Sequence, residues 1–398
     1  MPTKTKNKKV RVAKKRPVKK SKTSLWPFLL LALLVAVAGV LTYRHYHDAK
    51  KSDLSSFQAT PLYKVKPLVS PRLAPSGISP AKIKSLYGIG GSGGSGTIAI
   101  VDAYDDPTLE ADLAVFSSQY GLSACTTVNS CFEKHKMSDG VAASSDWAVE
   151  EALDTEWAHA IAPNAKILIV EANSASGTDL IDAVNYARNR SDVVAVSMSW
   201  GGNEFSTEAS YEANFTSAFG ASFFASSGDS GHGTGWPAVS ANVISVGGTK
   251  LNFNSRGTLT GEVAWTGSGG GISRYISEPL WQKNFTVPLT TSKRAVPDVS
   301  YDADPASGFP VYDSTPYSGS SGWFLVGGTS AGAPQWAAIK AISHSLTSTL
   351  LYTDAAKPRQ TYLRDITSGR NGFCGSLCMA KTGYDYVTGL GSPLTTVF

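Results

Sequence analysis

From residue 97 onward, short apolar runs alternate with longer stretches in which apolar residues recur at helical spacing. The runs are nearly continuous and rich in β-branched and aromatic residues, which favours strands buried on both faces of a parallel sheet. Alternating strands and helices predict a doubly wound α/β domain that binds ligands beyond the carboxyl ends of its strands. The predicted strands are residues 97–102, 166–171, 193–199, 221–226 and 243–247, and the predicted helices lie near 107–120, 146–161, 178–189 and 207–219.

The N-terminal part has a different pattern. Residues 1–24 contain eleven Lys and Arg and no acidic residue, and residues 25–42 form an uncharged apolar run. Such a run is just long enough to span a bilayer, and the preceding positive charge predicts that the N-terminus stays in the cytoplasm. We therefore predict a single-pass membrane anchor at residues 25–42, with the rest of the chain outside the cell. Secretion after signal cleavage is the alternative, because residues 36–38 (AVA) have the small-x-small form.

A linker is predicted between the anchor and the globular part. Residues 43–85 contain five prolines, which prevent long helices, and residues 88–96 are rich in glycine. One short helix is predicted within residues 79–88. The predicted divisions are thus a basic cytoplasmic tail (1–24), the anchor (25–42), an extracytoplasmic linker (43–85) and a folded domain (86–398).

The net charge of +5 combines two opposite contributions. Without the eleven basic residues of the tail, residues 25–398 hold 25 basic and 31 acidic residues, a balance of −6. An acidic folded part argues against nucleic acid as a partner. A chain with 42% apolar and 17% charged residues is also unlike a disordered protein.

The four cysteines form two local pairs, Cys125 with Cys131 and Cys374 with Cys378. Both pairs are close enough in sequence to form disulfides, which an oxidising exterior permits. A zinc site is the alternative. However, neither pair has the tight two-residue spacing of a typical zinc site, and His135 is the only histidine near either pair in sequence.

Ser330 is the first candidate for chemistry. It lies among small residues in residues 327–334 (GGTSAGAP), directly before an apolar, alanine-rich helical stretch. A tight turn into a helix exposes the hydroxyl group, and the helix N-terminus favours developing negative charge. An ordinary serine N-cap is the alternative interpretation.

A carboxyl pair is the best candidate for the base that a nucleophilic serine needs. Glu150 and Asp154 are four residues apart on a predicted helix, so their side chains share one face. That face also carries Trp147 and Trp157, which is not typical of a solvated charge face. Two carboxyls in a low dielectric share a proton and can act as acid and base.

A histidine base is the competing hypothesis. His135 follows Asp102 by 33 residues and precedes Ser330, which gives the order Asp, His, Ser of a subtilisin triad. The surrounding sequence, residues 133–136 (EKHK), is charged and loop-like, unlike the start of a buried catalytic helix.

Asp229 lies just after the predicted strand 221–226, among small residues in residues 226–231 (SSGDSG). At the carboxyl end of a strand it would face the same crevice as Ser330. A protonated carboxyl group can donate a hydrogen bond to an oxyanion. An aspartate that stabilises a turn at the strand exit is the alternative.

These motifs, with residues 150–154 (EEALD) among them, resemble the sedolisin family of serine-carboxyl peptidases, which share the subtilisin fold. The resemblance covers roughly residues 80–398 and implies a peptidase that acts on proteins or peptides at acidic pH. Carried over by motif, Ser330 is the nucleophile, Glu150 the general base, Asp154 the residue that orients and tunes it, Asp229 the oxyanion donor, and Trp200 a residue flanking the substrate cleft.

The resemblance also implies a calcium loop formed by Asp365, Ile366, Lys381, Gly383 and Asp385, where Lys381 replaces the glycine usual in the family. Carboxylates and backbone carbonyls are suitable Ca²⁺ ligands. A second difference concerns the prodomain, since family members commonly carry a folded one and residues 43–85 are too few to form it. An inactive, surface-tethered binding module of the same fold is therefore a further alternative.

Overall fold

The structure is a computed structural model that describes residues 3, 54–66, 75–289, 292–357 and 361–395. The chain divides into two units, residues 1–49 and 50–398, and the description below concerns the second. The anchor predicted at residues 25–42 lies outside the described residues. Within the described residues, no helix is both long enough and apolar enough to cross a membrane.

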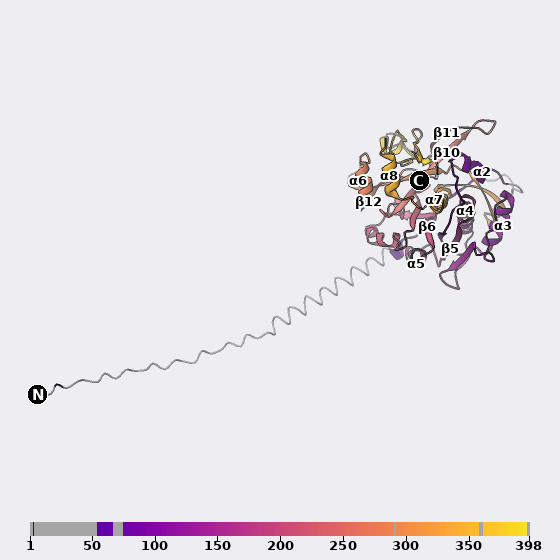
Figure 1. Cartoon of the computed structure of the whole chain (residues 1–398), viewed down its shortest axis with the longest axis horizontal. Coiled ribbons are helices and arrows are strands. Elements are labelled where there is room, and N and C mark those ends of the chain that lie inside the picture. Colours follow the sequence, from indigo (N-terminus) through magenta and orange to yellow (C-terminus); the bar gives the residue numbers. More distant parts are fainter. Residues whose placement is uncertain (1–2, 4–53, 67–74, 290–291, 358–360, 396–398) are drawn as a thin grey trace. The chain divides into compact units, whose positions relative to one another are not determined.

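An eight-stranded, mainly parallel sheet forms the centre of this unit, as the sequence predicts (Figure 1). Seven strands follow the order β11-β10-β8-β6-β3-β5-β4, and β14 also pairs with β10. Only the β10–β11 pair is antiparallel among the described strands of this sheet. The strands are β3 (Thr97–Ala103), β4 (Phe132–Lys136), β5 (Lys166–Ala172), β6 (Val193–Met198), β8 (Ser222–Ser226), β10 (Val243–Phe253), β11 (Leu259–Ala264) and β14 (Val299–Asp302).

Helices pack against both faces of the sheet, which confirms the doubly wound α/β prediction. Helices α4 (Ser145–Ile161) and α7 (Gly332–Ile342) cover one face, and α5 (Gly177–Arg188) covers the other. The other helical segments are α2 (Pro80–Leu86), α3 (Leu109–Tyr120), α6 (Leu280–Phe285), α8 (Ser348–Ala355) and the 3₁₀ turns η1 (Glu208–Phe215), η2 (Thr329–Ala331) and η3 (Gly375–Cys378).

The two faces of strand β3 belong to different hydrophobic cores. Ile98 and Ile100 lie in the core under α4 and α7, whereas Ala99 and Val101 lie in the core under α5. Successive side chains of a strand point to opposite faces, and all four residues are fully buried. Burial on both faces is why the apolar run of this strand is continuous.

Two elements differ from the sequence prediction. The predicted helix at 207–219 is the 3₁₀ segment η1. The predicted loop at 133–136 belongs to the edge strand β4, which carries charged residues because Lys134 and Lys136 both pair with Asp105, at 2.9 and 2.5 Å. Charged side chains are common on edge strands, where they discourage pairing with other chains.

Residues 54–66, part of the predicted linker, pack against the main body of this unit. They form β1 (Thr60–Pro61), which pairs antiparallel with β7 (Trp200–Asn203), and β2 (Lys64–Val65), which pairs antiparallel with β16 (Ser320–Gly327). The one proline of this segment, Pro61, lies in β1, and proline is compatible with a short edge strand. The remaining strands are β9 (Gly235–Trp236), β12 (Gly271–Ser277), β13 (Lys293–Val296), β15 (Phe309–Tyr317), β17 (Leu363–Arg364) and β18 (Ser392–Pro393).

Candidate active site

Ser330 lies in the 3₁₀ turn η2, directly before helix α7, and is fully buried. Its Oγ donates a hydrogen bond to Oε2 of Glu150 at 2.8 Å and lies 3.2 Å from the carbonyl oxygen of Ser199. Gly328 precedes the turn with φ +100°, a value that side chains rarely tolerate. The local sequence of small residues thus forms a tight turn that directs the hydroxyl group toward helix α4.

Glu150 and Asp154 lie one turn apart on α4 and are both fully buried. Ser199 Oγ donates to Oδ2 of Asp154 at 2.6 Å. Glu150 Oε1 and Asp154 Oδ1 have no hydrogen-bond partner among the described residues. Two neighbouring carboxyls with unpartnered oxygens can share one proton.

Burial is the main reason that the pKa values of Glu150 and Asp154 are raised well above their usual range. Repulsion by Asp154 and Asp102 raises the pKa of Glu150 further, whereas the hydrogen bond from Ser330 lowers it. A carboxyl pair that retains a proton at neutral pH can accept one from the serine and later return it.

Asp102 is a third carboxyl that acts on Glu150, although the sequence predicted it only as a partner of His135 in a triad. It lies near the carboxyl end of β3, is fully buried, and neither of its oxygens has a hydrogen-bond partner in the described part of the chain. Burial, followed by repulsion from Glu171, raises its pKa to about 8. An acid directly after the apolar run of residues 97–101 is the sequence signal that could have identified it.

Asp229 follows strand β8, and the structure brings it beside the turn that carries Ser330, as the sequence predicts. Its Oδ1 accepts hydrogen bonds from the backbone N–H and the hydroxyl group of Thr329, both at 2.8 Å. Its Oδ2 is buried without a partner in the regions that the structure describes. Burial raises the pKa of Asp229 to about 7, although the bonds from Thr329 and the charge of Lys64 oppose this.

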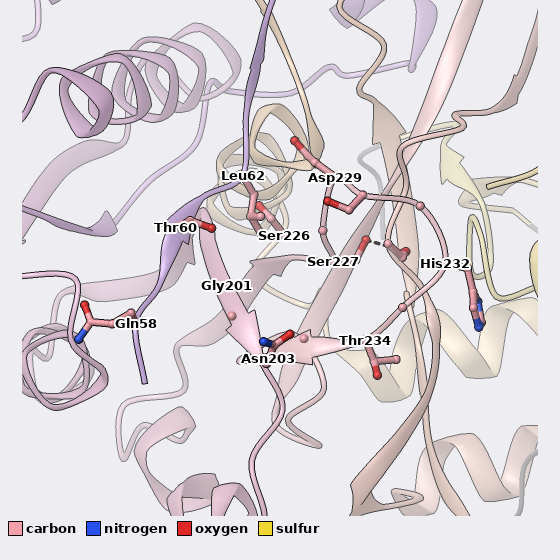
Figure 2. Close-up of a pocket in the computed structure, with 17 residues that line it drawn as sticks. Gln58, Thr60, Leu62, Gly201, Asn203, Ser226, Ser227, Asp229, His232 and Thr234 are labelled. Atoms are coloured by element: carbon pink, nitrogen blue, oxygen red, sulfur yellow. Dashed lines mark hydrogen bonds between the residues drawn. The ribbon is translucent and has the colours of Figure 1, made fainter. Parts of the chain in front are cut away.

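A cavity of about 400 Å³ lies beside Asp229 (Figure 2). One wall is formed by residues 226–231, which follow β8, and another by Gly201, Gly202 and Asn203 of β7. Gln58, Thr60 and Leu62 of the N-terminal segment line it as well. The cavity has the position expected for a substrate pocket, at the carboxyl ends of parallel strands.

Trp200, predicted to flank the substrate cleft, has a side chain that is fully buried with residues 54–66 in place. Its indole Nε1 donates to the carbonyl oxygen of Val101 at 2.8 Å, and its ring lies beside Trp236 with 5.9 Å between centroids. The backbone of Trp200 pairs with the N-terminal segment opposite Pro61, and its side chain belongs to the hydrophobic core that also contains Phe57.

His135 has a different environment from the one that a triad requires. Its ring stacks on Tyr186 of α5, with 3.6 Å between ring centroids, on the edge strand β4. The Ser330 hydroxyl group is instead directed at Glu150. The geometry therefore favours the carboxyl base over the histidine base.

The predicted calcium residues converge on one turn near the C-terminus. The Gly383 N–H donates to Oδ2 of Asp365 at 2.9 Å, and the Lys381 N–H donates to Oδ2 of Asp385 at 3.1 Å. Ile366 is buried directly after Asp365. Burial raises the pKa of Asp365 and brings that of Asp385 to about 6. Two desolvated carboxyls beside one turn are hard oxygen ligands, so the residue types fit Ca²⁺.

Both predicted cysteine pairs are disulfides in the structure, Cys125 with Cys131 and Cys374 with Cys378. The first closes the loop between α3 and β4, and the second spans the turn η3.

Comparison with known proteins agrees with this arrangement. Residues 133–372 match the family model described as the subtilase family. The chain is 33% identical to kumamolisin from Bacillus sp. (strain MN-32) over 364 residues, which cover 81% of this chain and 63% of kumamolisin. It is 28% identical to sedolisin from Pseudomonas sp. (strain 101) over 320 residues, which cover 71% of this chain and 53% of sedolisin.

A solved structure gives the same result. Pseudomonas sedolisin, a serine-carboxyl proteinase complexed with two molecules of pseudo-iodotyrostatin, matches with a TM-score of 0.67 and 27% identity, over 80% of this chain and 96% of that one. The chain thus spans between about half and two thirds of the two curated relatives but nearly all of the solved domain. The chain belongs to the subtilase family and, within it, to the sedolisins.

Proposed function

We propose that this protein is an extracytoplasmic serine-carboxyl peptidase that hydrolyses peptide bonds in proteins or peptides. The observation that carries the proposal is the 2.8 Å hydrogen bond from Ser330 Oγ to Glu150 Oε2 inside a buried carboxyl cluster. A nucleophile and a base within hydrogen-bond reach, with a third group orienting the base, are the parts that covalent acyl transfer needs.

In the proposed mechanism, Ser330 Oγ attacks the carbonyl carbon of the scissile bond while Glu150 accepts its proton. Asp154 holds Glu150 in place and shares the proton, and Ser199 fixes Asp154 through its hydroxyl group. The proton then passes to the leaving amine, which leaves an acyl ester on Ser330. Water hydrolyses the ester by the reverse sequence of proton transfers.

The oxyanion of the tetrahedral intermediate would receive hydrogen bonds from the Ser330 N–H and from Asp229 Oδ2. Asp229 can donate only when it is protonated, and its pKa is raised to about 7. Activity should therefore be high at acidic pH and fall as the pH rises through about 7. A binding module without turnover would lack this dependence.

Calcium is proposed as a structural ion held by Asp365 and Asp385, with carbonyl groups of Ile366, Lys381 and Gly383 as further ligands. When bound, it would supply positive charge that keeps both carboxyls ionised. The turn at 381–385 contacts both carboxyls through its backbone N–H groups, which supports the proposal.

The proposed location rests on the sequence alone. Residues 25–42 would anchor the chain in the cell membrane with the peptidase outside, and secretion after signal cleavage remains the alternative. Immunoblotting of membrane and medium fractions distinguishes them. A chain shortened by about 38 residues and found only in the medium would contradict the anchor.

The test of activity is digestion of casein at pH 4 and pH 9 by the wild type, Glu150→Gln and Glu151→Gln. Glu151 is the matched control because it is equally buried on the same helix, but its strongest charge interaction is with Glu171 and neither of its oxygens has a hydrogen-bond partner among the described residues. We expect cleavage at pH 4 by the wild type and Glu151→Gln, and none by Glu150→Gln. Equal cleavage at both pH values, or full activity of Glu150→Gln, would contradict the proposal.

A further inference from the structure

A second group of buried carboxyls lies where helices α3 and α4 pack against strand β15, and it contains none of the proposed catalytic residues. Figure 1 shows α3 and α4 side by side. Asp106 follows strand β3, Asp112 lies in the first turn of α3, and Asp313 lies in β15. Asp106 and Asp313 are fully buried, and Asp112 is 2% exposed. One carboxylate oxygen of each residue lies within 4.8 Å of those of the other two.

The negative charge of this group is not balanced by a basic side chain. Among the described residues, no Lys, Arg or His forms an ion pair with any of the three carboxyls. Lys134 reaches this region, but its Nζ donates to the backbone carbonyl oxygen of Asp106 at 2.6 Å. The ion pairs of Lys134 are with Asp105 and Glu171. Buried carboxylates that have lost their hydration and have no counter-charge repel one another, so the group needs either protons or a cation.

Two oxygens of the group are buried without a hydrogen-bond partner in the part of the chain that the structure describes, Oδ2 of Asp106 and Oδ2 of Asp313. The other oxygen of each carboxyl is bonded to backbone. Oδ1 of Asp106 accepts from the Thr108 N–H at 3.0 Å, and Oδ1 of Asp313 accepts from the Thr315 N–H at 2.7 Å. Because buried polar atoms nearly always have a partner, these two oxygens are positions at which a cation would bind.

Threonine hydroxyl groups add further oxygens to the group. Thr108 Oγ1 lies 3.0 Å from Oδ1 of Asp106 and 2.7 Å from Oδ2 of Asp112. Thr315 Oγ1 lies 3.1 Å from Oδ1 of Asp106 and 3.1 Å from Thr108 Oγ1. Each hydroxyl group carries one hydrogen and two lone pairs, so two hydrogens serve these four contacts. The hydroxyl oxygens can therefore coordinate a cation as well.

A fourth carboxyl borders the group from helix α4. Glu156 is fully buried, and its Oε1 and Oε2 accept from the Tyr312 N–H at 3.3 and 3.1 Å. Tyr312 directly precedes Asp313 in β15. The acidic side chains thus come from the loop after β3 and from α3, α4 and β15, which are elements far apart in the chain.

We propose that Asp106, Asp112 and Asp313 bind a Ca²⁺ ion. This site is separate from the C-terminal turn of Asp365 and Asp385, and the proposal does not depend on peptidase activity. Two oxygens bound to one Ca²⁺ lie at most about 5 Å apart, which is twice the usual Ca²⁺–oxygen distance of about 2.3–2.6 Å. The spacing of the three carboxylates meets this limit.

The donor atoms favour calcium over other divalent ions. They are all oxygens, and no His or Cys of the described chain belongs to this group, which is unlike a zinc site. Mg²⁺ usually keeps several waters and binds through one or two carboxylates, whereas Ca²⁺ accepts about six to eight oxygens in a flexible geometry. Three carboxylates with threonine hydroxyls in a buried position therefore fit Ca²⁺ better than Mg²⁺.

The ion would connect the loop after β3, the first turn of α3 and strand β15. A metal that closes a long loop is expected to stabilise a fold, because it restricts the unfolded chain. Helix α4 packs against both α3 and β15. The ion would therefore also support the helix that carries Glu150 and Asp154.

The direct test is to count calcium in the full-length chain with Ser330→Ala and Asp365→Asn, which prevent proteolysis and disable the C-terminal site. The protein is stripped with chelator, dialysed at pH 7 against calcium chloride and analysed by atomic emission. We expect one calcium ion per chain in this background and none after Asp313→Asn is added. Equal calcium contents with and without Asp313→Asn, including none in both, would overturn the proposal.

Asp302→Asn is the matched control. Asp302 is also fully buried and has one oxygen without a partner among the described residues, but it belongs to no comparable group there. This variant should keep the calcium ion, and its loss here too would speak against a specific role of Asp313. Circular dichroism checks the fold. If Asp313→Asn does not fold, Asp106→Asn replaces it, with the same expected loss of calcium.

Thermal unfolding distinguishes a metal ligand from a residue that only supports the fold. At a calcium concentration a hundredfold above Kd, the midpoint of unfolding should rise by about 4 °C in the background and should not change in Asp313→Asn. Without calcium, Asp313→Asn should not lower the midpoint, because it removes one of several neighbouring negative charges. An equal loss with and without calcium would contradict the proposal. A larger rise with Mg²⁺ than with Ca²⁺ would contradict the choice of ion.

Discussion

Two sets of buried carboxyls in this protein have opposite surroundings. Asp298 is fully buried, but Arg294 donates to both of its oxygens at 2.7 and 2.5 Å, and Tyr352 and the Ser245 N–H add further bonds. Glu150 and Asp154 are equally buried, yet no cation pairs with them among the described residues. Their interaction is with each other and with a serine.

The comparison shows how burial can serve stability in one place and chemistry in another. A buried carboxyl that is paired and fully hydrogen-bonded stays ionised and fixes the strands around it. A buried carboxyl without a cation keeps a proton, which can then move during a reaction. The two sets of carboxyls are equally buried, so the different roles come from their neighbours: one set has a paired cation and the other does not.

The largest expected effect is on activity at the unpaired set. Ser330→Ala should lower kcat by about 10⁴-fold or more, because the nucleophile is lost. Glu150→Gln should lower it by about 10²–10⁴-fold, because the amide cannot accept the proton. Steady-state kinetics on a soluble peptide at pH 4 measures both, and circular dichroism checks that the fold is kept. A variant that retains full activity would remove its residue from the proposed site.

The second effect concerns stability at the paired set. Asp298→Ala should lower the free energy of unfolding by about 3–5 kcal/mol, because Arg294 would stay buried without a counter-charge. Asp154→Asn should change that free energy by much less, because no cation loses its counter-charge. Urea denaturation of both variants tests the comparison, and equal losses would show that the two sets are not different in kind.

A third effect is on pH dependence. Asp229→Ala should reduce kcat by about 10²–10³-fold, as expected for loss of an oxyanion donor. Asp229→Asn keeps a donor that does not titrate, so its residual activity should no longer fall as the pH rises through about 7. If the wild type and Asp229→Asn have the same pH profile, Asp229 is not the group whose ionisation limits the rate.

The free energy of unfolding should also fall as the pH rises. The pKa of Asp229 in the folded protein, about 7, is above its usual value of 3.8, so the folded state binds this proton more tightly than the unfolded chain. Its contribution is fully present below pH 4 and is lost as the pH rises to about 7, on the order of a few kcal/mol. Thermal unfolding of Ser330→Ala, compared with Ser330→Ala/Asp229→Asn from pH 4 to 8, measures it. Identical pH dependence in both would contradict this assignment.

The smallest effect should come from the C-terminal carboxyls. At a calcium concentration a hundredfold above Kd, the ion should stabilise the fold by about 3 kcal/mol. Asp365→Asn should remove this gain with little change in the calcium-free protein, because Asp365 accepts one backbone hydrogen bond whereas Asp385 accepts several. No calcium in the purified protein by atomic emission, with stability unaffected by chelator, would exclude the ion.

Much of the core was predictable because its physical cause is local. The strand at 97–103 and its neighbours are continuous apolar runs, and the helix at 145–161 carries two acids on an apolar face. Asp229 was predicted to face the same crevice as Ser330 because the carboxyl ends of parallel strands share one edge of the sheet. Glu150 was predicted as the base from its place beside Asp154 on the apolar face of a helix. Family resemblance supplied the proposed roles of these residues.

The rest depends on contacts that are distant in sequence. Residues 54–66 contain one proline and no periodicity, so their pairing with β7 and β16 comes from the free edges of those strands. The burial of the Trp200 side chain depends in the same way on Val101 and Trp236. Asp102 was considered only as a partner for His135. Its place directly after an apolar run marks the end of a strand, but the contact of that strand with helix α4 depends on residues distant in sequence.

The central claim is that a carboxyl group, not a histidine, activates Ser330. The most direct measurement is peptide mapping after fluorophosphonate labelling at pH 4. We predict an adduct on Ser330 in the wild type and in His135→Ala, and loss of the adduct in Glu150→Gln. Labelling of Ser330 in Glu150→Gln at the wild-type rate, or its loss in His135→Ala, would contradict the account.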